Sequence, residues 1–256
     1  MRITIPHRTT RATIFEIECP RHLLDAKPGV RLGWAACRAV AEGIDLRGAV
    51  LMGADLSGAV LTGANLTRAR LDGADLRGAI LTGAWLDGAR LEGAVLTSAL
   101  LDGAWLSNAN LTGARLSNAN LTGARLDGAW LTRAALTGAN LAGAVLTSAW
   151  LDGANLPEGV PVVPHIDAAI LAAIEDGGML DMEDWHTCDT THCQAGWAVV
   201  MAGETGRKLE ERLGTNAAAA LIYAASRPGK PVPDWYASTA NALADLRAGA
   251  ANDPMT

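Results

Sequence analysis

The sequence predicts a β-solenoid with a cap at its N-terminal end and a small helical domain at its C-terminal end. Leucine occupies every fifth position from Leu46 to Leu156, 23 times in succession. Alanine stands two places before these leucines from Ala49 to Ala154, and glycine stands two places after them in 16 of the 23 units. These observations predict a chain that bends within every five-residue unit.

A period of five is incompatible with one long helix or one continuous strand. Five residues turn an α-helix by roughly 500°, so the leucines would drift around its surface. An odd period would also move leucine to the other face of a strand at every unit. A three-residue extended segment, Ala-x-Leu, followed by a two-residue turn places both apolar side chains inward. Coils built in this way stack about 4.8 Å apart and pair their backbone groups.

The repeat resembles a known pattern. Units such as residues 54–58 (ADLSG) and 64–68 (ANLTR) are similar to the A-(D/N)-L-x-x pattern of the pentapeptide-repeat family. The resemblance implies a right-handed quadrilateral β-helix with four units per coil, so that 23 units form nearly six coils. The sequence departs from the pattern before leucine, where Asp or Asn stands in only eight units. These eight are Asp45, Asp55, Asn65, Asp75, Asn110, Asn120, Asn140 and Asn155.

An open solenoid exposes unpaired edges and needs a cap at each end. Residues 1–43 are therefore expected to form an N-terminal α/β cap. Residues 13–18 alternate as a strand does, and residues 31–42 are expected to form a short helix that plugs the first coil. The plugging helix carries three larger apolar side chains, which are Trp34, Cys37 and Val40.

The repeat domain is assigned to residues 44–158, because the pattern stops at Leu156 and prolines follow. Residues 159–256 have helical periodicity and are expected to form a small α-helical domain. Its candidate helices span residues 166–176, 192–202, 207–212, 215–225 and 235–248.

With four units per coil, outward residues twenty positions apart stack in columns. Tryptophans pair in two of these columns, and aliphatic residues fill part of a third. The residues concerned are Trp85, Trp105, Trp130, Trp150, Val60, Ile80 and Leu100. Exposed apolar area often marks an interface, so these seven residues are the candidate surface for a protein partner or for self-association.

The outward residues also have a purely structural interpretation. The indoles could lie flat along the rod, with Arg125 over Trp105 as a surface cation–π pair. The arginines at 70 and 90 are expected to form a solvated charge ladder with Asp72 and Glu92.

The helical domain contains one dense polar cluster. His186, Cys188, His192 and Cys193 could bind zinc, or a Cys/His pair could act as a nucleophile. Structural zinc ligands normally come as pairs on separate turns, and adjacent residues point in different directions. The structural alternative is that Thr190 or Thr191 caps a helix near His192, while Cys193, Trp197 and Val200 pack inward. The segment is similar to the WHTC-x-TTHC-x-AGW stretch that accompanies pentapeptide repeats in bacterial and prophage proteins.

Composition limits the function classes further. The net charge of −6 divides into +3 for residues 1–43, −2 for residues 44–158 and −7 for residues 159–256. Neither the repeat region nor the acidic C-terminal region carries a basic stripe, so direct nucleic-acid binding is not expected. Four cysteines are too few for a disulfide scaffold, and the N-terminal segment lacks an apolar signal region. We therefore expect a cytoplasmic protein that is not bound to a membrane and has no cofactor.

Three functions remain open. The first is a non-enzymatic interaction or scaffold protein, because a uniform rod wall has no cleft for catalysis. The second follows from the resemblance: some family members mimic B-DNA and act on type II topoisomerases such as gyrase. Mimicry needs a dense acidic surface, whereas residues 44–158 carry ten acidic and eight basic side chains. The third is a metal-binding protein or Cys/His enzyme that uses the polar cluster.

Overall fold

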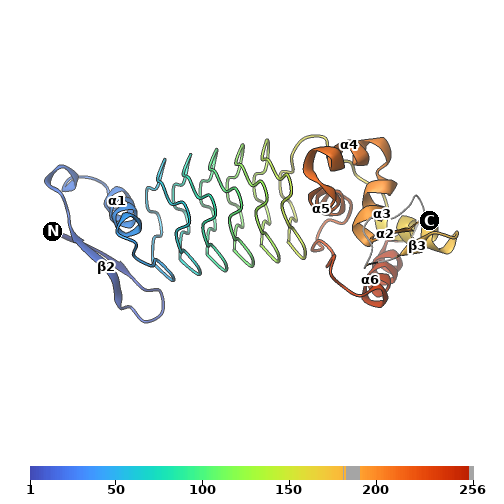
Figure 1. Ribbon diagram of the computed structural model, residues 1–256, viewed down its shortest axis with the longest axis horizontal. Helices are drawn as coiled ribbons and strands as arrows, with labels where there is room; N and C mark the ends of the chain where they lie inside the picture. The colour runs from blue at the N-terminus through green and yellow to red at the C-terminus, as the bar shows by residue number, and fades with distance from the viewer. Residues whose placement is uncertain (181, 183–190, 254–256) are drawn as a thin grey trace.

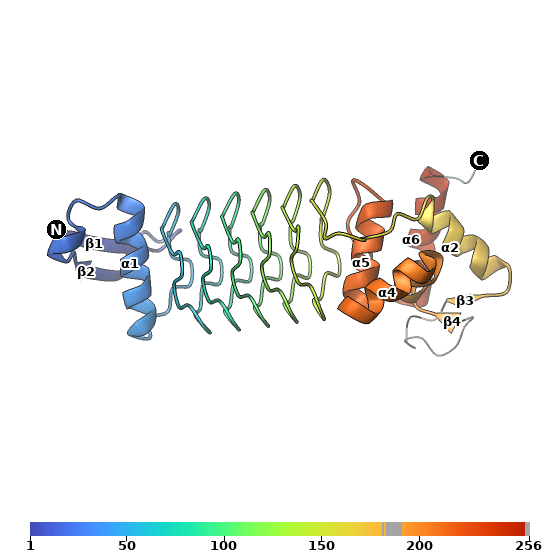
Figure 2. The same ribbon diagram turned by 90° about the horizontal axis from the view of Figure 1, so that it is seen from above.

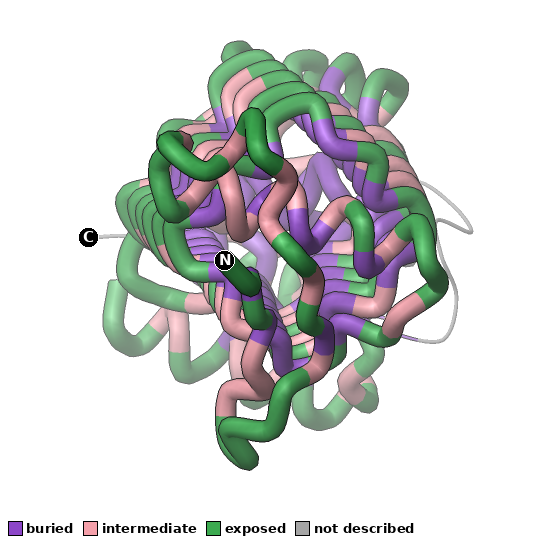
Figure 3. The backbone as a smooth tube through the Cα atoms, turned by 90° about the vertical axis from the view of Figure 1, so that its left-hand side faces the viewer, coloured by how far each residue is buried: buried purple, intermediate pink, exposed green. Residues whose placement is uncertain are grey.

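The protein is an elongated rod. The computed structural model describes residues 1–180, 182 and 191–253, with the backbone alone for residues 191 and 192. An N-terminal cap lies at one end, the stacked coils form the middle and a helical domain lies at the other end (Figure 1). Figure 3 looks along this axis and shows the coils stacked behind one another, with exposed corners around a buried interior.

The coils are joined by hydrogen bonds between residues about one coil apart. Parallel bridges link Trp85 to Trp105 and Trp105 to Arg125, and equivalent bridges form four columns along the rod. The Trp85 N–H donates to Ala64 O (3.0 Å), and the Leu86 N–H donates to Trp105 O (2.7 Å). One coil therefore takes four five-residue units, as predicted, and the cross-section has four sides.

The interior consists of the repeated alanine and leucine side chains. Every Leu of the repeat from Leu46 to Leu151, and every Ala from Ala49 to Ala149, is buried. From Gly48 to Gly153, the residue two places after Leu adopts a left-handed backbone whether or not it is glycine, with φ of 59° at Gly103 and 58° at Asn108. Glycine predominates at this corner because a Cβ is unfavourable there. This confirms the predicted turn.

The N-terminal cap joins an antiparallel hairpin to a helix. Its elements are β1 (Arg2–Pro6), β2 (Thr13–Glu18), the 3-10 helix η1 (Arg21–Leu23) and α1 (Pro28–Ala41). The predicted strand at residues 13–18 is confirmed, the predicted helix begins three residues early, and β1 is an element that the prediction missed. Two backbone hydrogen bonds join the first coil to this cap: Val50 N donates to Pro6 O (3.0 Å), and Asp55 N donates to Gly29 O (2.9 Å).

Small residues make the contact between α1 and the first coil. A Cβ at Gly33 would overlap the carbonyl oxygen of Asp55, and a Cβ at Gly29 would overlap that of Gly53. The prediction that this helix covers the first coil is confirmed, and Trp34, Cys37 and Val40 are half-buried side chains that pack against the core. The backbone at Gly29 and Gly33 lies against the coil edge, where Gly29 O accepts a hydrogen bond from Asp55 N, and the alanines at 35, 36 and 39 are fully buried.

The C-terminal region contains five helices among its described residues. They are α2 (Ile166–Glu175), α3 (Gln194–Met201), α4 (Gly203–Leu213), α5 (Thr215–Ser226) and α6 (Thr239–Asn252). Two short strands, β3 (Met179–Leu180) and β4 (Thr191–His192), pair in parallel. Each predicted helix is present, with shifted ends.

Caps explain two of the shifts. The Sγ atom of Cys193 accepts a hydrogen bond from Gly196 N (3.4 Å), so α3 starts after Cys193. The predicted cap at Thr190 or Thr191 is wrong. Ser238 caps α6 through Asn241 N (3.4 Å), so this helix starts at Thr239 and not at Trp235. Cys193 and Trp197 are buried as predicted, whereas Val200 is half-buried.

Helix α5 lies across the last coil, in the position that α1 takes at the first (Figure 2). The segments that flank α5 bind the coil edge, because Gly143 N donates to Leu213 O (2.7 Å) and Val232 N donates to Ala149 O (2.8 Å). Alanines 217–220 of α5 are completely buried. Both edges of the rod are thus covered by a helix with small side chains.

We expect Gly33→Ala to destabilise the N-terminal cap by at least about 1–3 kcal/mol, because the added methyl group meets backbone atoms that cannot move aside. Hydrogen exchange of the amides in α1 and the first coil measures the effect. Arg38→Ala, on the exposed side of the same helix, is the matched control and should change stability by less than about 1 kcal/mol. Equal protection in both variants would contradict the close contact.

Candidate functional site

The first candidate surface is the Trp85 face, which we define as the outward column Asn65, Trp85, Trp105, Arg125 and Val145. Trp85 and Trp105 are 48% and 44% exposed, and their ring centroids lie 6.2 Å apart at an angle of 31°. The Arg125 guanidinium carbon lies 5.2 Å from the Trp105 ring centroid, which confirms the predicted cation–π pair. The two indoles project from adjacent coils and remain accessible.

The second candidate surface is the aliphatic face, which begins with Val60, Ile80 and Leu100. Val60 is 63% exposed, Leu100 is 41% exposed and Ile80 is half-buried. The chain turns one corner between Leu100 and Trp105, so the aliphatic face and the Trp85 face are neighbouring sides of the rod. The corners between them carry Thr82 and Asp102, both half-exposed, so the two faces are apolar patches on adjacent sides of the rod.

The second tryptophan pair lies on the next side of the rod, which we call the Trp130 face. Trp130 and Trp150 are 57% and 39% exposed and are joined by a parallel bridge. Toward the N-terminal end the same column carries Arg90 and Arg70. All seven outward residues are therefore placed as the columns predict, although their role in binding remains a prediction.

Ion pairs occur at several places along the rod. The predicted charge ladder is present, because Arg90 Nε contacts Asp72 Oδ1 (3.1 Å) and Arg70 Nε lies 3.6 Å from Asp72 Oδ2. It is not solvated throughout as predicted, since the Asp72 side chain is only 14% exposed. Asp75 binds Arg77, and hydrogen bonding to this guanidinium lowers the pKa of the Asp75 carboxyl. Several acidic groups of the rod are thus neutralised by neighbouring arginines.

The helical domain contains a buried polar network that sequence analysis missed. Arg227 contacts Asp167 (Nε to Oδ2, 3.1 Å) and Asp245 (Nη1 to Oδ2, 3.2 Å). Gln194, which is buried, donates from Nε2 to the Tyr223 hydroxyl (3.2 Å) and to Asp245 Oδ2 (3.4 Å). The network connects α2, α3, α5 and α6 through residues that share no sequence spacing.

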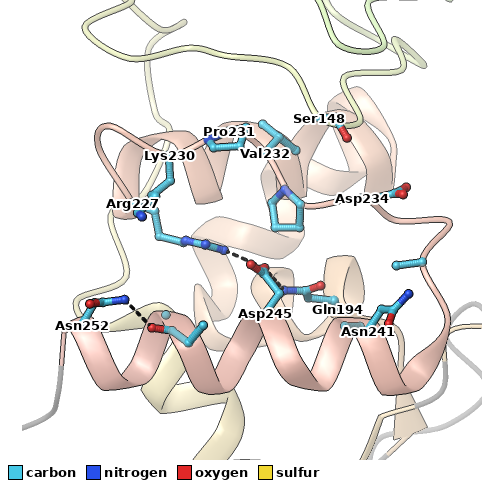
Figure 4. A pocket seen from close by; sticks show the side chains of 15 residues that line it. Ser148, Gln194, Arg227, Lys230, Pro231, Val232, Asp234, Asn241, Asp245 and Asn252 are labelled. Atoms are coloured by element: carbon cyan, nitrogen blue, oxygen red, sulfur yellow. Dashed lines mark hydrogen bonds and ion pairs between the residues drawn. The ribbon is translucent and has the colours of Figure 1, made fainter.

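A cavity of about 530 Å³ lies beside this network, between α6 and the segment that follows α5 (Figure 4). Arg227 points across it to Asp245, and Ser148 from the rod lies at its edge. Its walls mix prolines and alanines with polar side chains. Asp167 is 5% exposed, and burial raises the pKa of its carboxyl to about 6 although Arg227 opposes the shift.

The predicted metal or nucleophile cluster lies largely outside the described residues. His186 and Cys188 belong to the residues that are not described, and for His192 the backbone alone is described. Cys193 is buried, and desolvation raises the pKa of its thiol. The zinc and Cys/His alternatives therefore remain predictions.

The fold and its displayed side chains define a class: a β-helical repeat protein with an apolar surface on a rigid rod. The sequence profile of pentapeptide repeats matches the chain in eight copies, over overlapping segments that span residues 37–156. The chain belongs to the pentapeptide repeat family, whose members fold as right-handed quadrilateral β-helices. A comparison with curated proteins found no match.

Solved structures of pentapeptide repeat proteins resemble parts of the chain. One from the Arabidopsis thaliana thylakoid lumen is 37% identical over 38% of this chain and 68% of its own, with a TM-score of 0.38. Rfr23 from the cyanobacterium Cyanothece 51142 is 41% identical over 36% of this chain and 59% of its own, with a TM-score of 0.31. QnrB1, a plasmid-mediated fluoroquinolone resistance protein, is 21% identical over 48% of this chain and 62% of its own, with a TM-score of 0.32.

Within the described residues, no helix combines the length and apolar character needed to cross a membrane.

The raised pKa of Asp167 predicts a pH dependence of stability. The folded protein binds this proton more tightly than the unfolded chain, so the stabilisation is present below pH 3.8 and is lost as the pH rises through about 6. Asp167→Asn stays neutral, so its stability relative to the wild-type protein should rise by up to about 3 kcal/mol between pH 4 and pH 7. Hydrogen exchange of the α2 amides in both proteins measures this. Parallel profiles would contradict the prediction.

Proposed function

We propose that the protein is a non-enzymatic interaction or scaffold protein whose rod presents tryptophan and aliphatic side chains to a protein partner. The observation that carries this proposal is the pair of apolar patches on the Trp85 face and the aliphatic face. Four of their side chains, Val60, Trp85, Leu100 and Trp105, are each more than 40% exposed. Solvent contact at large apolar groups is unfavourable, and a partner that covers them removes this cost.

The rigidity of the rod supports the same proposal. Each outward residue is held by a buried Ala-x-Leu unit and by hydrogen bonds to adjacent coils. Binding to a surface that is already ordered loses little conformational entropy, and tryptophan is among the residues most enriched at energetic centres of interfaces. The side chains are therefore arranged as a preformed contact surface.

The DNA-mimic alternative is less well supported. Mimicry of duplex DNA requires a dense row of unneutralised negative charges. On this rod Arg77 binds Asp75, and Arg90 binds Asp72. The acidic side chains therefore do not form the continuous charged surface that this mechanism needs.

The proposal predicts that Trp85→Ala/Trp105→Ala loses the protein partner that the wild-type chain captures from the cells that encode it. Removing both indoles should weaken binding at least tenfold, because a tryptophan at the centre of an interface commonly contributes about 2 kcal/mol or more. A tenfold change in the dissociation constant corresponds to about 1.4 kcal/mol. Arg115→Ala, an exposed change on another side of the rod, is the matched control and should retain the partner. If the wild-type protein, the double tryptophan variant and the Arg115 variant all capture the same proteins, the proposal is refuted.

We also expect no effect of the protein on DNA supercoiling by gyrase at stoichiometric concentration, because arginines pair with several of its acidic groups and interrupt the negative charge along the rod. A supercoiling assay with and without the protein measures this, and a variant with Arg77→Ala/Arg90→Ala tests whether unpairing the acids creates an effect. Inhibition or protection of gyrase by the wild-type protein would favour the DNA-mimic alternative instead.

A further inference from the structure

We propose that the Trp85 face binds a second copy of this chain, side by side and antiparallel, around a twofold axis that passes between the levels of Trp85 and Trp105. This inference rests on the proposed function and specifies the partner. Three features support it: the symmetry of one column, the charges beside it and the net charges that the sequence gives to the two end regions.

The column is self-complementary under reversal. Its bridges place Asn65, Trp85, Trp105 and Arg125 at equal steps along the rod. When two such faces meet with opposite directions, Trp85 of each copy meets Trp105 of the other, so four half-exposed indoles bury one another. Asn65 then meets Arg125, whose guanidinium can donate to the amide oxygen. This places apolar groups at the centre and polar groups at the rim, as in typical interfaces.

The corner residues beside the column add a second match. Arg68 and Asp127 lie at the same corner of the rod, directly after the Trp85 face, three coils apart. Arg68 is exposed and Asp127 is half-exposed. The same reversal brings Arg68 of one copy to the level of Gly128 of the other, next to Asp127. Arg68 thus comes near a carboxylate that its own chain holds through Arg125 (Nε to Oδ2, 3.5 Å), and a twofold axis repeats this contact at both ends of the interface.

The ends of the rod favour the antiparallel direction. Residues 1–43 carry a net charge of +3 and residues 159–256 carry −7. The two regions lie at opposite ends of the molecule (Figure 1). Antiparallel packing therefore places each basic cap beside an acidic domain, whereas parallel packing would place like charges together. An isologous contact of this kind closes after two copies.

Sedimentation of the full chain from 1 to 100 µM tests the proposal. We expect a concentration-dependent dimer, and Trp85→Gln/Trp105→Gln should raise its dissociation constant at least tenfold. Trp130→Gln/Trp150→Gln makes the same change on the neighbouring face and should leave the constant within about twofold. Circular dichroism verifies that both variants are folded. A chain that stays monomeric at 100 µM, or a dimer that only the Trp130 variant weakens, overturns the proposal.

Charge reversal tests the direction. Arg68→Glu and Asp127→Arg should each weaken the dimer at least threefold, and the double variant should restore it, because the two side chains face each other only in the antiparallel arrangement. Failure of the double variant to restore binding overturns the antiparallel register. If the chain is monomeric but Trp85→Ala/Trp105→Ala still removes a different protein partner, this inference is wrong and the proposed function stands. If the chain is monomeric and the double variant also keeps every captured protein, both the inference and the proposed function are wrong.

Discussion

The five-residue period is the constraint on which the structure depends. It places one alanine and one leucine inside each side of every coil, and it puts the backbone of each unit against the unit about one coil away. Packing and hydrogen bonding thus follow from the same spacing. Because the interior admits only these small and medium side chains, the outward residues are free to vary without disturbing the core.

The same stacking leaves two open edges, and the chain closes both with helices that approach by their backbone or by small side chains. The need for caps follows from the repeat alone. The contact itself could not be predicted, because the role of Gly33 depends on Asp55 O, which belongs to a different element.

Sequence reasoning succeeded where periodicity determines geometry. The columns and the Arg125–Trp105 contact follow directly from a coil of four units. It failed where residues distant in sequence meet, as Asp167 and Arg227 do in the helical domain. No local pattern marks such a pair, since the relative placement of α2 and α5 decides it. The start of α3 was missed because a thiol, at Cys193, takes the place of the usual hydroxyl or carboxylate cap.

The position before leucine shows why the tryptophans bear on function. Where Asp or Asn stands there, its side chain stabilises the following turn, as Asp55 does by accepting from Ser57 N (3.2 Å) and Asn65 by accepting from Thr67 N (3.2 Å). A tryptophan at the equivalent position cannot accept this hydrogen bond, and it exposes a large apolar ring. Both effects are unfavourable for an isolated rod. The ring contact between Trp85 and Trp105 and the Arg125 cation–π contact offset only part of this cost, because both rings stay more than 40% exposed. Contact with a second surface would bury the apolar area that remains exposed.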